Sequence, residues 1–373
     1  MSRWSRILLV LAALLAAVSS SLAAGTVKLP PPDLRGLVPL AALPLDKPAV
    51  PLPAVAPTPP PVALPDLPPL RAGTDPRQRP TPALPPPRTL ACNPIGTVLG
   101  VASELLECGR ARYQRNELEE ARDAFQKAIQ QSSDRGLLRE ARYWQAETLL
   151  RLGRAPEVER ILQLVVQDDP RSEFGLYAAD ELGWVSLELG DPRRALGYFD
   201  GLLKLGPPPG LATYARHGRA MALYGLKRYA EARDEWAGLL NLGGFSRPSA
   251  PAAVVAESNL WLGDTLGRLG DYKGAVPRLQ AAVASGASRP IVDGALLRLG
   301  WWSRLAGDAP EAVKAYRRLL ASNPSGNDAL WARAGLVQAL LDTGDYTGAR
   351  EEAVKLEAAD RSRTFSLATW LIV

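Results

Sequence analysis

The amino-acid sequence predicts an all-α fold, a superhelical solenoid of about seven helical hairpins that follows a signal peptide and a disordered Pro-rich segment. Three observations predict it. Related segments recur about every 37 residues between Ala121 and Ala349. Gly-Asp pairs, as in "RLGDYKGA" and "LDTGDYTGA", interrupt apolar stretches with three- and four-residue spacing, which indicates helices joined by tight turns. Most prolines lie before residue 91, outside these segments.

Residues 1–24 have the layout of a secretory signal peptide. Arg3 and Arg6 precede an apolar run over 7–18, and Ala23 and Ala24 suit cleavage. The run is short for a bilayer span, although its Ala-rich flanks extend it enough for an uncleaved anchor. No Cys follows it for lipid attachment. We therefore expect an exported protein in the periplasm of a Gram-negative bacterium, anchored in the inner membrane if the signal is retained.

Residues 25–91 contain the bulk of the prolines, with 21 of the 34 between Leu29 and Leu90. The segment lacks the large apolar side chains that offset the entropy of ordering, so we expect a disordered tether. Runs such as Pro85–Pro87 favour polyproline II, which suits either a spacer or a docking site for a proline-binding groove.

The net charge of +5 also belongs to this amino-terminal part. Nine basic and four acidic residues precede residue 91, whereas 35 of each follow it. The repeated part therefore has no excess charge to attract phosphates, and we expect no nucleic-acid partner.

Cys92 and Cys108 are the two cysteines of the chain. A pair in an oxidising compartment suggests a disulfide. However, Asn93-Pro94 has the pattern of a helix N-cap followed by Pro in the first turn. One helix from there through Cys108 would hold the thiols more than ~20 Å apart, which favours a free, buried Cys108. A break at Gly96 or Gly100 would instead let Cys92 fold back.

One position recurs seven times. It is occupied by Ala121, Val158, Ala195, Ala232, Ala275, Ala312 and Ala349, spaced by 37 residues except for one interval of 43. Four residues later come Phe125, Leu162, Phe199, Trp236, Leu279 and Tyr316, but Ala353 in the last unit. Earlier in each unit stand Gly109, Ala146, Gly183, Ala220, Gly263 and Gly300, with Val337 the exception. We expect the small residues to let paired helices approach, and the large ones to fill space against the neighbouring unit.

The turns within the hairpins have their own signature. A residue that tolerates left-handed φ is expected to end the first helix at Gly153, Gly190, Gly270, Gly307 and Gly344. The following Asp191, Asp271, Asp308 and Asp345 are expected to cap the second helix. Pro192 suits the first helical position, and Asp308 with Glu311 matches a capping box.

The solenoid is expected over 92–373, with units near 102–135, 139–172, 176–209, 213–244, 256–289, 293–326 and 330–363 and the start of an eighth at 366–373. Six extra residues within Asn241–Ala253 account for the long interval, and we expect an exposed, protease-sensitive loop there. The apolar end Thr369–Val373 would leave the last unit uncapped, so we expect self-association through it.

Three segments resemble the tetratricopeptide repeat: "LGWVSLELGDPRRALGYFDGLLKLGP" (182–207), "LGDTLGRLGDYKGA" (262–275) and "LGWWSRLAGDAPEAVKAYRRLLASNP" (299–324). They carry the family's Leu-Gly in the first helix, Ala and an aromatic residue in the second, and Pro after it. The resemblance covers about residues 102–373 and implies a right-handed superhelix. The 37-residue period, longer than the usual 34, is similar to that of exported bacterial members.

The sequence offers little material for catalysis. With one His and two Cys, and without phosphate-binding glycine motifs, we expect no enzyme, no metal site and no cofactor. A carbohydrate-active enzyme would need further chain to carry its chemistry. Acidic pairs such as Asp168-Asp169 and Glu119-Glu120 are interpreted as solvated surface.

The resemblance implies a concave groove, lined by the first helices, that accepts protein or peptide segments. Candidate groove residues are Tyr177, Trp184, Tyr214, His217, Met221, Tyr224, Trp301 and Trp331, with charge from Arg110, Glu147, Asp264 and Arg304. We expect about half of the first eight to be core instead. Adjacent Trp301 and Trp302 point about 100° apart and cannot fill one pocket. His217 is expected to be partly exposed.

These observations favour an exported, non-enzymatic scaffold that binds protein segments in envelope assembly or cell division. The alternative is a structural spacer in a secretion or exopolysaccharide-export complex.

Overall fold

The computed structural model describes residues 79–85, 92, 101–241, 251–325 and 327–360. This part contains fourteen α-helices and no strand. They are α3 (Ala102–Gln114), α4 (Leu118–Gln131), α5 (Arg135–Arg151), α6 (Ala155–Asp168), α7 (Glu173–Glu188), α8 (Pro192–Lys204), α9 (Pro209–Gly225), α10 (Tyr229–Asn241), α11 (Ala252–Arg268), α12 (Tyr272–Ala284), α13 (Arg289–Leu305), α14 (Ala309–Ser322), α15 (Asn327–Asp342) and α16 (Tyr346–Ala359). The predicted all-α fold is confirmed.

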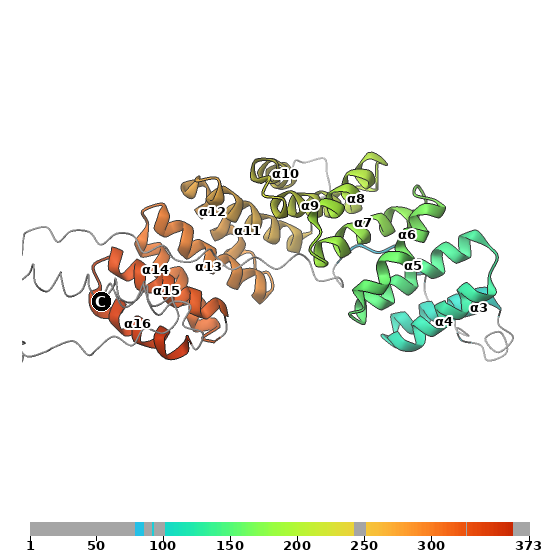
Figure 1. Ribbon diagram of the computed structural model, residues 1–373, viewed down its shortest axis with the longest axis horizontal. Coiled ribbons are helices and arrows are strands. Elements are labelled where there is room, and N and C mark those ends of the chain that lie inside the picture. The colour runs from blue at the N-terminus through green and yellow to red at the C-terminus, as the bar shows by residue number, and fades with distance from the viewer. Residues whose placement is uncertain (1–78, 86–91, 93–100, 242–250, 326, 361–373) are drawn as a thin grey trace, which may run out of the picture. The chain divides into compact units, whose positions relative to one another are not determined.

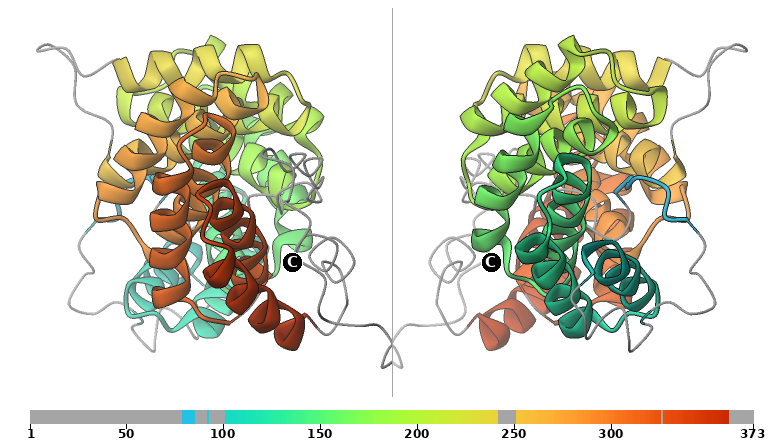
Figure 2. Two further views of the ribbon diagram at one scale, coloured as in Figure 1. Left: turned by 90° about the vertical axis from the view of Figure 1, so that its left-hand side faces the viewer. Right: turned by 90° about the vertical axis from the view of Figure 1, so that its right-hand side faces the viewer.

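The helices form seven consecutive antiparallel hairpins, stacked in chain order from α3 and α4 at one end to α15 and α16 at the other (Figures 1 and 2). Each helix packs against the next along the chain. The first helix of each hairpin also contacts the first helix of the next, from α3 to α15. Successive second helices make no comparable contact in the described part. The first helices are therefore the more closely packed row. The surface that this row turns away from the second helices is called the first-helix face below.

The recurring small and large residues form the core that the repeat predicted. The seven positions from Ala121 to Ala349 are fully buried, as are the large side chains from Phe125 to Tyr316 that follow them. A Cβ added to Gly183 would lie 2.5 Å from the Phe199 ring, and one added to Gly218 of the next hairpin would lie 2.3 Å from it. The ring thus fills the space between two hairpins, and glycine makes both approaches possible.

The hairpin turns also follow the prediction. All five turn glycines have positive φ, from 75° at Gly153 to 87° at Gly307. All four aspartates cap the second helices; at α14, for example, the Glu311 N–H donates to Asp308 Oδ1 over 3.0 Å. Two hairpins have no glycine at this turn. Asn116 and Lys227 occupy the equivalent positions and adopt φ of 63° and 60°.

The helix α3 begins at 102, where the first unit was expected. The later first helices begin three or four residues before the expected unit starts, for example α5 at 135 instead of 139 and α11 at 252 instead of 256. Local capping explains the earlier start of α5, since Asp134 accepts a hydrogen bond from the Leu137 N–H.

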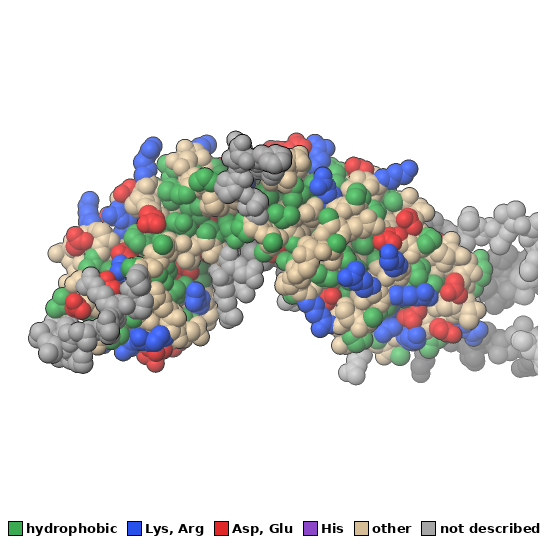
Figure 3. Space-filling model, turned by 180° about the vertical axis from the view of Figure 1, so that it is seen from behind, with side chains coloured by type: hydrophobic (Ala, Val, Ile, Leu, Met, Phe, Trp, Pro, Cys, Tyr) green, Lys and Arg blue, Asp and Glu red, His purple; other side chains and the backbone are tan. Residues whose placement is uncertain are grey.

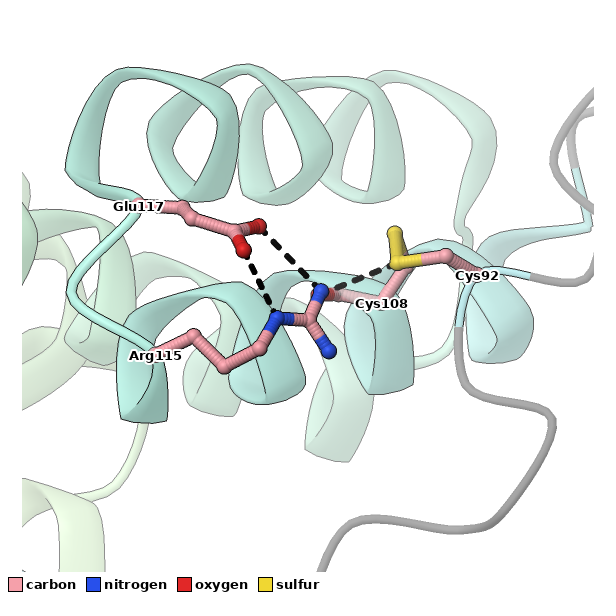
Figure 4. Close-up of a disulfide and its surroundings, with 4 residues drawn as sticks. All are labelled: Cys92, Cys108, Arg115 and Glu117. Carbon is pink, nitrogen blue, oxygen red and sulfur yellow. Dashed lines mark hydrogen bonds and ion pairs between the residues drawn. A yellow bond between two sulfur atoms is a disulfide. The ribbon is translucent and has the colours of Figure 1, made fainter.

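The expectation of a free Cys108 is wrong, because Cys92 and Cys108 form a disulfide with their Cα atoms 4.4 Å apart (Figure 4). A helix running from Asn93 would prevent this, but α3 begins only at Ala102, and Cys92 has a φ of 71°. The disulfide therefore fixes the residue at position 92 to the first helix of the solenoid. Beyond it, Arg115 pairs with Glu117 at the turn into α4, with Nε 2.8 Å from Oε1.

Several expectations fall on residues outside the described ranges. These are the signal peptide, most of the Pro-rich segment, residues 242–250 of the long interval, and residues 361–373 with the expected eighth unit. Among the residues that are described, no helix is long and apolar enough to cross a membrane.

Candidate peptide-binding site on the first helices

Residues 79–85, the sequence Arg-Pro-Thr-Pro-Ala-Leu-Pro, lie against the first-helix face beside α5 and α7 (Figure 1). Arg79 and Pro82 are buried, and Leu84 packs on the core formed by the first three hairpins. At the other end, Gln114 Nε2 of α3 donates to the Pro85 carbonyl over 3.2 Å. This part of the Pro-rich segment is therefore ordered on the solenoid, which corrects the expectation of a tether disordered throughout 25–91.

Arg79 inserts its guanidinium between two carboxylates of α7. Its Nη1 donates to Glu181 Oε2 over 2.7 Å, and its Nη2 donates to Glu188. The guanidinium carbon also lies 5.1 Å from the centre of the Trp184 ring, within range of a cation–π interaction. Only 5% of Arg79 is exposed. We call this site the Arg79 pocket; it is formed by Asp180, Glu181, Trp184 and Glu188.

The geometry of one helix builds this pocket. Asp180, Trp184 and Glu188 are spaced by four residues, and Glu181 precedes Trp184 by three, so all four lie on one side of α7. The Trp184 Nε1 donates to Asp180 Oδ2 over 3.1 Å and so fixes the ring that Arg79 covers. An indole face and several carboxylates within just over two turns of helix make a receptor for a guanidinium.

The pocket continues into α5, where Glu147 is also buried. The hydroxyls of Tyr143 and Tyr113 donate to its two carboxylate oxygens over 3.2 and 3.4 Å. Burial, reinforced by the charge of Glu181, raises the pKa of Glu147 to about 8. Burial likewise raises the pKa of Asp180 well above its usual range, with Glu181 adding to the effect.

Acidic groups thus outnumber cations among the described residues of this site. Burial opposes the charge of Arg79, yet Glu181 and Glu188 outweigh it, so that the pKa of Arg79 is raised. A buried carboxylate without a cation is strongly unfavourable. Burial raises the pKa of Glu181 as well, and the positive charge of Arg79 acts in the opposite direction. The pocket therefore needs a guanidinium, or a comparable cation, to favour the ionised form of Glu181.

The profile of the tetratricopeptide repeat family matches residues 106–172, 181–239, 260–327 and 304–364, more than half of the chain. The chain belongs to the tetratricopeptide repeat family. No curated protein shows a significant match to the sequence.

Solved structures agree on the fold. A tetratricopeptide repeat protein from Parabacteroides merdae superposes with a TM-score of 0.50 at 14% identity, over 72% of this chain and 98% of that one. The Cut9–Hcn1 hetero-tetramer of the APC/C gives a TM-score of 0.52 at 16% identity, over 67% of this chain and 44% of that one. The pilF protein of Pseudomonas aeruginosa gives 0.48 at 14% identity, over 63% and 96%. At such identities the likeness shows the fold alone.

Two of the groove residues that the resemblance to tetratricopeptide repeats implied lie at the Arg79 pocket. They are Trp184 and Glu147. Both are buried, Trp184 beneath Arg79 and Glu147 within reach of its charge. Each is a buried residue beside Arg79, and their role in binding a partner segment stays a prediction.

Three further candidates are core residues. Tyr214, His217 and Met221 are buried along α9. The expectation that His217 is partly exposed is wrong, since none of it is exposed. Its Nδ1 accepts from the Trp236 Nε1–H over 3.3 Å, and its Nε2 lies 3.1 Å from a carboxylate oxygen of Glu257. His217 is thus the polar centre of the contact between the fourth and fifth hairpins.

Tyr224 and Asp264 also meet, in a second buried cluster. Asp264 of α11 accepts from the Tyr224 hydroxyl, from Arg268 Nε over 2.9 Å and from Trp302 Nε1 over 3.1 Å. None of Asp264 is exposed. Burial opposes its ionisation, but Arg298 and Arg268 hold the pKa of Asp264 below its usual range. This cluster joins three hairpins and is a structural contact rather than a ligand site.

The remaining candidates are half-buried and already have neighbours. Tyr177 packs between two core clusters, Trp301 stands edge-on to Trp302, and Trp331 packs on the last two hairpins. Arg110 pairs with Glu107 and Glu140, and Arg304 pairs with Asp342.

The residues that sequence reasoning missed are Arg79, Asp180, Glu181 and Glu188. The signal for the acidic pair was present, because "AADELGW" places Asp180-Glu181 within an apolar helix immediately before Trp184. Two adjacent carboxylates in such a setting require a cation from elsewhere. Over the face seen in Figure 3, by contrast, basic and acidic side chains are interspersed, and no area of one sign stands out.

Proposed function

We propose that this protein is a non-enzymatic scaffold whose first-helix face binds extended protein segments. One observation carries the proposal: that face already holds an extended segment of the same chain, through Arg79 at α7, Leu84 on the core and Pro85 at α3. Tetratricopeptide repeats are interaction modules, and their stacked helices offer a long surface for such contacts.

We further propose that the scaffold works outside the cytoplasm, in the assembly of the cell envelope or in cell division. The Cys92–Cys108 disulfide supports this, because disulfides persist in oxidising compartments and are rare in the cytosol. The signal-like amino terminus supports it as well. A carboxy-terminal fusion to a phosphatase that folds only after export tests the location, with activity expected; an inactive, cytosolic fusion overturns it.

Binding is tested by screening the full chain against a library of displayed 12-residue segments and titrating the selected peptides by fluorescence anisotropy. We expect saturable binding that Glu188→Lys on the first-helix face weakens at least tenfold. The matched control is Glu120→Lys, the same charge change at an exposed position of the second helix α4, which should have no effect. A screen without saturable binders, or equal effects of both changes, favours the structural spacer.

A further inference from the structure

We propose that the Arg79 pocket recognises an arginine followed by a Pro-rich stretch in a partner protein, and that residues 79–85 occupy it as a tethered competitor. The inference rests on the proposed function and adds the class of segment that is bound. It also adds a condition, that the chain's own segment must leave before the partner's segment enters.

The contacts specify arginine over lysine. The guanidinium is held at two nitrogens by carboxylates two turns apart on α7, and its carbon lies over the Trp184 ring, 5.1 Å from the ring centre. A planar fork satisfies these three contacts together, whereas an ammonium group is a compact point charge that does not stack in the same way. The carboxylates of Glu181 and Glu188 supply the negative charge opposite the guanidinium.

The contacts also specify the residues after the arginine. A proline after the arginine restricts the backbone of both residues, so Arg79-Pro80 has few conformations to lose on entering the pocket. Pro82 is buried and Leu84 reaches the core, which sets the spacing from the arginine to the two apolar contacts. The segment runs from α7 toward α3, and a partner with the sequence Arg-Pro-x-Pro-x-Leu would meet the same positions.

The chain's own segment does not satisfy the pocket completely. Within the described part, Arg79 Nε and Asp180 Oδ1 are buried and have no hydrogen-bond partner. Unpaired buried polar atoms weaken a complex. A partner that pairs Asp180 Oδ1, or that brings an arginine whose own Nε is paired, would bind the pocket better, contact for contact, than residues 79–85 do.

The advantage of the chain's own segment is its attachment. Cys92 is joined to Cys108 of α3, so the covalent path from Pro85 to the solenoid is short. Short connections give effective concentrations on the order of millimolar. Such a competitor reduces the apparent affinity for a free peptide to the fraction of pockets that it leaves empty, a loss of about tenfold or more for an intrinsic Kd on the order of 100 μM or below.

The test uses the full chain and a fluorescent peptide with the sequence of residues 78–85, Gln-Arg-Pro-Thr-Pro-Ala-Leu-Pro. We expect weak binding to the unaltered protein and at least tenfold tighter binding to Arg79→Ala. Leu84→Asp, which weakens the bound segment but retains Arg79, should also tighten binding. Glu181→Gln introduced together with Arg79→Ala should remove the gain, and a peptide with Gln in place of its Arg should fail to bind any of the proteins.

The outcomes separate this inference from the proposed function. If Arg79→Ala and Leu84→Asp fold normally by circular dichroism and bind the peptide no better than the unaltered chain, residues 79–85 are not a competitor. If the Arg and Gln peptides bind equally, the face binds segments but does not select arginine. If folded Arg79→Ala binds no peptide from the displayed library either, the proposed function itself fails.

Discussion

Arg298 of α13 lies buried against Asp264 of α11, with its Nε 3.4 Å from Asp264 Oδ1 and neither side chain more than 2% exposed. The same carboxylate accepts from Arg268, Tyr224 and Trp302, so one acidic group connects the first helices of three consecutive hairpins. The candidate that the sequence placed among groove charges is therefore a structural centre of the solenoid.

Replacing Asp264 by Asn should destabilise the protein strongly, because it removes the carboxylate charge that lies against the buried Arg298 guanidinium. Breaking one partner of a buried ion pair costs about 3–5 kcal/mol. The control is Asp342→Asn, which breaks the more exposed pair with Arg304 and should cost about 0–1 kcal/mol. Urea unfolding followed by circular dichroism measures both, and equal losses would contradict the central role of Asp264.

The raised pKa of Glu147 predicts a pH dependence of stability. Between its ordinary pKa of 4.5 and the folded value of about 8, the folded state retains a proton that the unfolded state has lost. The stabilisation is complete below 4.5 and is lost as the pH rises toward 8. The midpoint of urea unfolding should fall from pH 5 to pH 8, and Glu147→Gln should reduce that fall.

The raised pKa of Asp180 contributes with the same sign, so part of this pH dependence should remain in Glu147→Gln. Glu120→Gln, at an exposed position of α4, serves as the control and should follow the unaltered protein at every pH. A Glu147→Gln profile that also coincides with the unaltered protein would mean that Glu147 is ionised in the folded state.

Gly218→Ala should destabilise the contact between the third and fourth hairpins. Its Cβ would lie 2.3 Å from the fully buried Phe199 ring, and forcing extra volume into a packed core costs about 1–3 kcal/mol. Gly197→Ala on α8 provides the opposite control: its Cβ meets nothing within 4 Å, and alanine in a helix gains about 0.5–1 kcal/mol over glycine. Thermal unfolding should shift in opposite directions for the two variants.

Lys227→Gly should stabilise the turn between α9 and α10. Lys227 is exposed and adopts a φ of 60°, where glycine stands in five other hairpins. Glycine relieves the strain of the left-handed backbone, but it also gives the unfolded chain more conformational freedom. The net increase in the free energy of unfolding is roughly 0.5–1 kcal/mol. Gly270→Lys, the reverse change at the φ of 84°, should lose stability by a similar amount. Two changes of the same sign would contradict this explanation.

The fold could be predicted because its signals are local. A turn glycine, the aspartate after it and the alanine four residues later lie within one short segment, and repetition made them visible. Gly153 and Asp308 behave as their sequence contexts indicate, since backbone conformation and capping depend on near neighbours.

The site could be predicted only in part, because its decisive contacts join distant residues. Arg79 and Glu181 are 102 residues apart in the chain, and nothing around Arg79 distinguishes it from the neighbouring Pro-rich sequence. His217 was misjudged for the same reason, since Trp236 and Glu257, which satisfy its ring nitrogens, come from two other helices. Burial of a polar side chain depends on partners that only tertiary packing supplies.

The placement of two of the large rings between pairs of glycines has a consequence for how this protein can gain or lose repeats. Phe199 lies between Gly183 of its own hairpin and Gly218 of the next, and Tyr316 lies in the same way between Gly300 and Gly335. A duplication therefore preserves these ring–glycine contacts when the duplicated unit contains a second helix and the first helices on both sides of it. An insertion or deletion of a whole period preserves these matches only if the new neighbour also offers glycine where the ring arrives. Lengthening this array by recombination is constrained less by helix count than by which side chains meet at the junction.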